Sequence, residues 1–229
     1  MKKSVVLLSG GMDSSVNLLA AREESQVVLA LTFDYGQRAA PKEIEVTSKL
    51  TKKLQIPHRV LPLPFFSDLG HSSLIDRQQT VPVGSAVSID DPKTSEKTAQ
   101  SVWVPNRNGI FLNVAAGFAE ALGADWIVPG FNQEEASTFP DNSEEYLQAA
   151  TQSLKFSTAN QVQVKCFTVK MNKTEIVGLG LKLQMDWSWM WPCYFNQSRW
   201  CGQCESCQRS KRALRAQGVA VETYFESAK

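Results

Sequence analysis

Two groups of residues in this chain have residue types and a spacing that are suited to binding a ligand or a metal ion. One is a glycine turn near the N-terminus, Ser-Gly-Gly-Met-Asp-Ser, at residues 9–14. The other is a cluster of four cysteines near the C-terminus, at Cys193, Cys201, Cys204 and Cys207. A glycine turn that opens a helix is suited to binding phosphate, and a group of thiolates is suited to binding a metal ion.

The glycine turn, which we call the phosphate loop, follows an apolar run and precedes a helical pattern. Unpaired backbone N–H groups and the positive end of the helix dipole face an anion at such a point. Gly10 and Gly11 allow close backbone approach, and Ser9 and Ser14 add hydroxyl donors. The loop has neither the Gly-Lys-Ser/Thr ending of a Walker loop nor the G-x-G-x-x-G pattern of dinucleotide-binding folds. A strand-to-helix turn without a ligand is the alternative interpretation. The expected nucleotide contacts are Leu8, Ser9, Gly10, Gly11, Met12, Asp13, Ser14 and Ser15, with Asp13 and Ser14 catalytic.

The cysteine cluster has the spacing C-x7-C-x2-C-x2-C, and Gly202 supplies a tight turn between two of its members. Four thiolates saturate a tetrahedral zinc ion, so we expect one structural Zn²⁺ per chain. An iron–sulfur cluster is the main alternative. In the ferredoxin pattern a proline follows the remote cysteine, whereas here Pro192 precedes Cys193, which favours zinc. Cys166 lies outside the cluster and is expected to be a small buried side chain.

The composition is typical of a globular chain, and its net charge is close to zero. Of its 229 residues, 43% are apolar and 21% are charged, with 24 Lys and Arg against 23 Asp and Glu. The net charge of +1 gives no general attraction for nucleic acid or anionic membranes, so we expect no stable nucleic-acid binding. No charge-free stretch approaches the roughly 20 residues that span a bilayer, and no signal peptide is evident. We expect a cytoplasmic protein.

The apolar pattern alternates between predicted strands and helices, which indicates an α/β fold with a doubly wound parallel sheet. The expected strands cover residues 4–8, 27–33, 59–63, 125–128 and 162–169. The expected helices cover residues 14–24, with Asp13 or Ser14 as N-cap, and 41–54, 108–122, 143–156, 173–185 and 206–217.

Two domains follow from this pattern: a body at residues 1–186 and a metal-bound tail at 187–229. Residues 65–102 show little periodicity, which is typical of a mobile lid or of a dispensable surface insertion. Trp187, Trp189 and Trp191 alternate as on one face of a strand, where core or interface packing is favoured over base stacking.

The loop Ser-Gly-Gly-x-Asp-Ser resembles the pyrophosphate loop of the N-type ATP pyrophosphatases, which cleave ATP between its α and β phosphates. Together with the cysteine tail it resembles the 7-cyano-7-deazaguanine synthase family of queuosine and deazapurine biosynthesis. Further matching segments lie at residues 33–38, 104–108 and 139–141. The resemblance implies an adenine nucleotide alpha hydrolase-like fold, a zinc-bound tail and a homodimer.

The same resemblance implies a ligase that uses ATP with Mg²⁺ and ammonia to convert a carboxylated deazaguanine base into a nitrile. Arg107 is then a catalytic clamp for phosphate or carboxylate, because its guanidinium matches two oxygens. The residues implied to contact the base are Gln37, Arg38, Asn108, Ser137, Phe139 and Asp141. In this chain the histidine that commonly follows Gln-Arg in the family is Ala39, and the next glutamate is shifted to Glu43.

Two other functions remain open from the sequence. One is a pyrophosphate-loop enzyme that adenylates a different base or a tRNA nucleoside, which would need a basic face. The other is a sensor that binds ATP without turnover. The basic residues of the tail either contact RNA or belong to a solvated helix, and the second interpretation needs fewer assumptions. They are Arg199, Arg209, Lys211, Arg212 and Arg215. His58 and His71 are expected to be structural.

Overall fold

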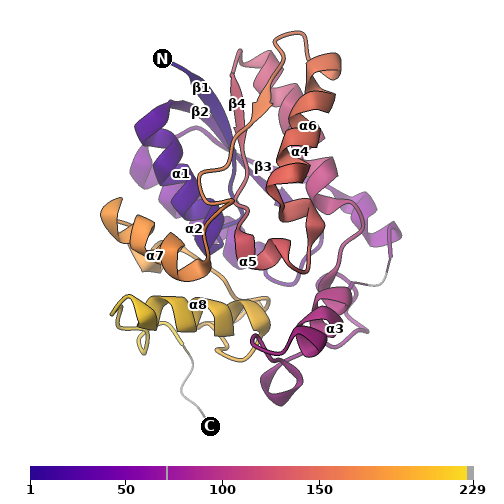
Figure 1. The fold of residues 1–229 in the computed structure, drawn as a ribbon, viewed down its shortest axis with the longest axis vertical. Coiled ribbons are helices and arrows are strands. Elements are labelled where there is room, and N and C mark those ends of the chain that lie inside the picture. The colour runs from indigo at the N-terminus through magenta and orange to yellow at the C-terminus, as the bar shows by residue number, and fades with distance from the viewer. Residues whose placement is uncertain (71, 226–229) are drawn as a thin grey trace.

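The computed structural model describes residues 1–70 and 72–225, so His71 lies outside the described residues. Its centre is a five-stranded sheet with the strand order β3-β2-β1-β4-β5, and every pairing is parallel (Figure 1). The strands are β1 (Lys3–Leu7), β2 (Gln26–Asp34), β3 (His58–Pro62), β4 (Trp126–Val128) and β5 (Gln163–Val164). This arrangement confirms the predicted doubly wound α/β fold.

Helices cover both faces of the sheet (Figure 1). The flanking helices are α1 (Met12–Glu24), α2 (Ala40–Leu54), α4 (Arg107–Ala121) and α6 (Glu144–Ser157). The other helices are α3 (Pro92–Val102), α5 (Gln133–Ala136), α7 (Lys173–Lys182) and α8 (Glu205–Ala216). Short 3-10 turns are η1 (Pro64–Asp68), η2 (Gly84–Ala86), η3 (Pro140–Asn142) and η4 (Trp187–Trp189). Within the described ranges, no helix has both the length and the apolarity that crossing a membrane would demand.

Strand β1 is buried on both sides because its side chains alternate between two cores. Val5 packs in one cluster with Leu112 of α4 and Leu154 of α6. Val6 packs in the other with Leu18 of α1 and Leu50 of α2. The continuous apolar run of this strand is therefore the pattern expected of a central parallel strand.

The described part of the tail packs against α1 and α7 in a third cluster, which contains Trp187, Trp191 and three of the clustered cysteines. The prediction that the tryptophans alternate along a strand was wrong, because η4 replaces the strand. The Asp186 carboxylate accepts a hydrogen bond from the Ser188 backbone N–H and closes this turn. Trp187 and Trp191 are both buried, so packing explains them as expected.

Two predicted boundaries differ from those in the structure. Strand β5 is limited to Gln163–Val164, since beyond it the Phe167 N–H donates to the Asn17 side chain and the Thr168 hydroxyl donates to the Phe131 carbonyl. Helix α1 begins at Met12 with Gly11 as N-cap, not with Asp13 or Ser14.

Two further differences concern helices: one helix was not predicted, and another ends earlier than predicted. Residues 65–102 contain α3, whose N-cap Asp91 accepts a hydrogen bond from the Thr94 N–H at 3.0 Å. Helix α7 ends at Lys182, and Gln184 takes a left-handed conformation with φ 57°. The role of residues 65–102 as a lid stays a prediction.

The phosphate loop lies where the order of the strands reverses. β1 and β4 are neighbours, and ligands of open parallel sheets bind at the carboxyl ends of the strands at such a point. The segment after β4 runs directly against the start of α1: a Cβ on Gly130 would lie 2.4 Å from the Ser14 backbone nitrogen. Only a glycine allows this approach, so the two loops form one backbone surface.

We expect Gly130→Ala to destabilise the protein by about 1–3 kcal/mol, because the new methyl group collides with backbone that cannot move aside. Urea denaturation measures the change. Gly117→Ala on α4 is the matched control, since a Cβ at that position meets nothing within 4 Å. The control should be neutral or gain up to ~1 kcal/mol from helix propensity. Equal stability of Gly130→Ala and the native protein would contradict the close packing described here.

Candidate active site

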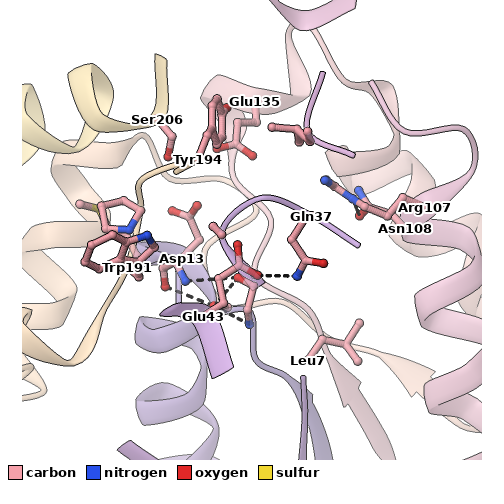
Figure 2. Close-up of a pocket in the computed structure, with 18 of the residues that line it drawn as sticks. Leu7, Asp13, Gln37, Glu43, Arg107, Asn108, Glu135, Trp191, Tyr194 and Ser206 are labelled. Carbon is pink, nitrogen blue, oxygen red and sulfur yellow. Dashed lines mark hydrogen bonds between the residues drawn. The ribbon is translucent and has the colours of Figure 1, made fainter. Parts of the chain in front are cut away.

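A cavity of about 240 Å³ opens at the carboxyl ends of β1 and β2 (Figure 2). Its walls come from the phosphate loop, the segments after β2 and β4, the start of α4 and the cysteine tail. Segments that are far apart in the sequence therefore meet in one site. The tail supplies Trp191, Tyr194 and Ser206 to the same cavity that the phosphate loop lines.

The phosphate loop has hydroxyl groups held in place and a helix start without a side-chain cap. The Ser9 and Ser14 hydroxyl oxygens are 3.0 Å apart, and the Ser14 hydroxyl contacts the Gly11 carbonyl at 3.2 Å. No side chain caps α1, and its first helical hydrogen bond runs from the Ser15 N–H to Gly11. The Gly11 N–H donates to the Ser9 hydroxyl at 3.3 Å, whereas the N–H groups of Met12, Asp13 and Ser14 have no helical partner and can meet an anion.

Gly10 lets this loop fit between neighbouring elements. It has a φ of +79°, and a Cβ there would lie 2.7 Å from Cγ2 of Val46 on α2. Its carbonyl accepts a hydrogen bond of 2.7 Å from the Trp191 N–H, which joins the tail to the loop. The loop is thus fixed by α2 on one side and by the tail on another.

A buried charge cluster lies directly behind the loop. The Lys173 ammonium is 2.5 Å from Asp13 Oδ2 and 2.7 Å from Glu135 Oε1. Asn132 also donates to Asp13 Oδ2, at 3.3 Å, whereas Asp13 Oδ1 is buried without a hydrogen-bond partner. Burial raises the pKa of Asp13 to about 6, although the Lys173 charge opposes the rise. Burial also lowers the pKa of Lys173, but Asp13 and Glu135 more than offset this and leave it above its ordinary value.

Gln37 and Glu43 form a second polar group in the wall. The Gln37 amide donates to Glu43 Oε2 at 2.7 Å and to the Phe33 carbonyl at 3.0 Å, and its oxygen accepts from the Tyr35 N–H (Figure 2). Burial raises the pKa of Glu43 from 4.5 to about 7, opposed by the Gln37 hydrogen bond and by the charge of Arg107. Gln37 therefore holds Glu43 in position.

Arg107 is the first residue of α4, and its guanidinium lies 5.9 Å from the centre of the Tyr35 ring. Its Nη1 donates to the Tyr35 hydroxyl at 3.4 Å. None of the ion pairs among residues 1–70 and 72–225 involves Arg107, in contrast to Lys173 and Arg209. A cation in a cavity wall without a carboxylate partner is suited to binding an anionic ligand.

The four thiols of the cysteine cluster lie within 4.8 Å of one another. Cys201 Sγ and Cys207 Sγ are 3.9 Å apart, and the backbone N–H groups of Cys201 and Cys204 point at cluster sulfurs. Gly202 makes the turn with a φ of +69°. These thiols can therefore bind one metal ion. Cys166 lies apart from them, and burial raises the pKa of its thiol.

Most residues predicted for the site line the cavity. Those that do are Leu8, Ser9, Gly11, Met12, Asp13, Ser14, Gln37, Arg38, Arg107, Asn108 and Phe139. Gly10, Ser15, Ser137 and Asp141 do not. Arg38 lines the cavity, but its guanidinium donates to the backbone carbonyls of Ser73, Asp76 and Gln79. It thereby fastens the segment after η1 to the wall.

Several important residues of the cavity were missed from the sequence. These are Glu135, Lys173, Tyr194 and Glu205, all of which line it. No local pattern marks them, because Lys173 meets Asp13 only through the fold, 160 positions away. The sequence marks Glu43 only as a glutamate displaced from its usual position in the family. The expectation that the basic residues of the tail lie on a solvated helix was wrong for Arg209, which is buried in ion pairs with Glu205 and Glu134.

We expect the pKa of Glu43 to appear as a pH dependence of stability. A raised pKa means that the folded state favours the protonated acid, so this stability is present below pH 4.5 and is lost as the pH rises through about 7. Glu43→Gln mimics the neutral acid and should therefore be more stable than the native protein at pH 8, by about 1–3 kcal/mol, but not at pH 4.5. Denaturant titrations across this range measure the difference. A constant difference would show that Glu43 does not titrate there.

Comparison with known proteins identifies the family. The profile described as queuosine biosynthesis protein QueC matches residues 3–218. A relative from Bdellovibrio bacteriovorus named 7-cyano-7-deazaguanine synthase is 57% identical over 226 residues, with 98% of each chain covered. A relative of the same name from Desulforamulus reducens is 48% identical, with 97% of each chain covered. One from Methanosarcina mazei is 43% identical, with 95% of each covered. The chain therefore belongs to the queuosine biosynthesis protein QueC family.

Proposed function

We propose that this protein is a 7-cyano-7-deazaguanine synthase, which converts 7-carboxy-7-deazaguanine and ammonia into the nitrile at the expense of ATP. The observation that carries the proposal is the uncapped start of α1 beside the buried, unpartnered Asp13 Oδ1, in a cavity at the switch point of the sheet. A triphosphate supplies the anion that the helix start lacks, and the Mg²⁺ that accompanies it fits the carboxylate oxygen. Family membership supplies the substrate class.

In this proposal the phosphate loop holds the β and γ phosphates of ATP, which leave as pyrophosphate. Backbone N–H groups and the Ser9 and Ser14 hydroxyls stabilise the charge that develops on the leaving group. The oxygens of the loop also fit Mg²⁺, which prefers oxygen ligands: Asp13 Oδ1 has no hydrogen-bond partner, and Ser9 and Ser14 of the same loop carry hydroxyl groups. When bound, Mg²⁺ neutralises part of the phosphate charge.

The reaction balances with two ATP molecules. A carboxylate oxygen of the base attacks the α phosphorus, and pyrophosphate leaves. Ammonia then adds to the acyl carbon and AMP departs, which gives the amide. The amide oxygen attacks a second ATP in the same way, and loss of a proton and AMP leaves the nitrile. Both carboxylate oxygens therefore end in AMP, and the protein contributes mainly alignment and charge stabilisation.

Arg107 is the proposed clamp for the carboxylate, because no ion pair of the described residues engages its guanidinium. Arg38 lines the cavity without an ion pair as well, but three backbone carbonyls occupy its guanidinium. Asn108 is the best supported of the proposed base contacts: its Nδ2 is buried without a hydrogen-bond partner and it lines the cavity. Phe139 lies in the same wall. Contacts from Gln37, Arg38, Ser137 and Asp141 remain proposals from the family resemblance.

We infer that the cysteine cluster holds a structural zinc ion. Zn–S bonds of about 2.3 Å in a tetrahedron place the sulfurs about 3.8 Å apart. The Cys201–Cys207 separation of 3.9 Å agrees with that spacing. An iron–sulfur cubane binds each thiolate to a different iron and so spreads the thiolates further apart.

We also infer from the family resemblance a cytoplasmic homodimer that takes free ammonia and acts on the free base, without stable binding to nucleic acid.

The proposed activity is tested by incubating the protein with ATP, ammonium and 7-carboxy-7-deazaguanine. We expect nitrile, AMP and pyrophosphate, with no pyrophosphate release when the base is omitted. Asp13→Asn and Ser14→Ala should lower kcat at least about 100-fold, because the first removes the charged oxygen proposed to hold Mg²⁺ and the second removes a hydroxyl donor to the departing pyrophosphate. Glu23→Gln is the matched control, an acid-to-amide change at an exposed position of the same helix. Mass spectrometry and a pyrophosphate assay give the readout.

Release of ADP, or of pyrophosphate without the base, would contradict the proposal. ATP binding without any turnover would favour a sensor. Activity on tRNA in place of the free base would favour a tRNA-modifying enzyme.

Metal analysis tests the zinc inference. We expect one zinc and no iron per chain, and Cys207→Ser should lose the metal and lower the melting temperature, because metal binding contributes folding free energy to the tail. Cys166→Ser is the control, since Cys166 lies outside the cluster, and it should keep the zinc. Stoichiometric iron with visible absorption would contradict the zinc assignment.

A further inference from the structure

The cavity has two chemically different parts on either side of the phosphate loop. Near the sheet its wall is apolar and is formed by Leu7, Leu31, Phe33 and Phe111, the last two stacked at 4.2 Å. Near the tail its wall carries the polar side chains of Tyr194, Glu205, Ser206 and Arg209, beside Trp191, Pro192 and Cys193. Figure 2 shows Leu7 on one side of Asp13, and Tyr194 and Ser206 on the other.

This division places the two substrates of the proposed function. With the triphosphate on the phosphate loop, the flat apolar faces of adenine fit the apolar wall beside the sheet. The acceptor base must approach the α phosphorus from elsewhere, which leaves it the polar part of the cavity. A deazaguanine presents an amidine edge there, with a ring N–H and an exocyclic amine. Both groups donate hydrogen bonds, so this part of the cavity needs an acceptor.

Glu205 has a buried oxygen without a hydrogen-bond partner, which can act as this acceptor. It is only 5% exposed, and its Oε1 accepts hydrogen bonds from Arg209 Nε at 3.1 Å and Nη2 at 2.8 Å. Its Oε2 is buried without a hydrogen-bond partner. A buried carboxylate oxygen without a donor is costly, and a ligand donor removes that cost. The terminal torsion of a glutamate is soft, so Oε2 can turn toward a donor while Oε1 stays near Arg209.

The other carboxylates of the cavity wall are engaged elsewhere. Asp13 and Glu135 share the Lys173 ammonium, and the free oxygen of Asp13 lies at the phosphate loop. Glu43 receives the Gln37 amide, and burial raises its pKa to about 7. Asp141 does not line the cavity. Glu205 is therefore the carboxylate that faces the polar part with an oxygen to spare.

The cysteine cluster and its neighbours hold Glu205 in this place. Glu205 is the first residue of α8, directly after the helix N-cap Cys204. Arg209, one turn later, is itself held by Glu134 at 3.2 Å and by the Ser95 hydroxyl of α3 at 3.1 Å. A metal ion in the cluster would therefore fix the start of the helix that carries Glu205.

We propose that Glu205 determines base specificity: its Oε2 accepts hydrogen bonds from the amidine edge of the deazaguanine acid. The proposal rests on the proposed function and assigns to the tail a part of the substrate site. A site built around a buried acceptor rejects a base that lacks the matching donor, because the acceptor is then left unpaired.

The test compares 7-carboxy-7-deazaguanine with the analogue that lacks the exocyclic amine. We expect native protein to prefer the guanine acid by about 100-fold in kcat/KM. In Glu205→Gln the KM for the guanine acid should rise at least about tenfold, the KM for ATP should stay unchanged, and the preference should fall to within about threefold. Equal use of the two bases by native protein would overturn the proposal, whether or not the variant folds.

Two further variants test whether the preference depends on the Glu205 carboxylate itself or on other charged residues of the tail. Arg209→Lys keeps a cation beside the Glu205 carboxylate, so it should retain the preference. Glu222→Gln is an acid-to-amide change at an exposed position of the same tail, outside the cavity wall, and should retain it as well. Loss of the preference in either variant, or its survival in Glu205→Gln with native metal content, would overturn the proposal. If native protein makes nitrile but fails this comparison, only the role of Glu205 falls. If it makes no nitrile, the proposed function falls with it.

Discussion

A single buried ammonium group holds together the charges around the phosphate loop. Lys173 is in contact with Asp13 and Glu135, two carboxylates that would repel each other in a cavity of low dielectric. Its backbone N–H donates to Glu134, and the opposite oxygen of Glu134 accepts from Arg209 and Arg212 of the tail. Removing one partner from such a network leaves buried charge uncompensated, so the loop, α5, α7 and α8 depend on one another.

Close backbone contacts add a second constraint at the same place. Gly130 lies against the backbone of Ser14, Gly10 lies against Val46, and the Trp191 N–H is bonded to the Gly10 carbonyl. These contacts keep the start of α1 open toward the cavity. They also join the cysteine cluster to the phosphate loop: the segment that carries the cluster contributes to the cavity wall and bonds directly to the loop.

The sequence allowed the parts of the site that are local in the chain to be predicted. The phosphate loop and the cysteine cluster are short patterns whose chemistry follows from residue type and spacing, and the parallel sheet follows from buried apolar runs. Lys173 and Glu205 could not be predicted, because an ordinary lysine and glutamate gain their roles only from partners brought close by the fold. Helix α3 was missed because few of its residues are apolar, with Ala99 and Val102 its buried apolar side chains.

The central claim is that the substrate carboxylate attacks the α phosphorus of ATP at this loop. Its most direct test uses 7-carboxy-7-deazaguanine labelled with ¹⁸O in both carboxylate oxygens, followed by mass spectrometry of all products. We expect two AMP molecules for each nitrile, each carrying one ¹⁸O, and unlabelled pyrophosphate. Label in inorganic phosphate or in water, with unlabelled AMP, would contradict it.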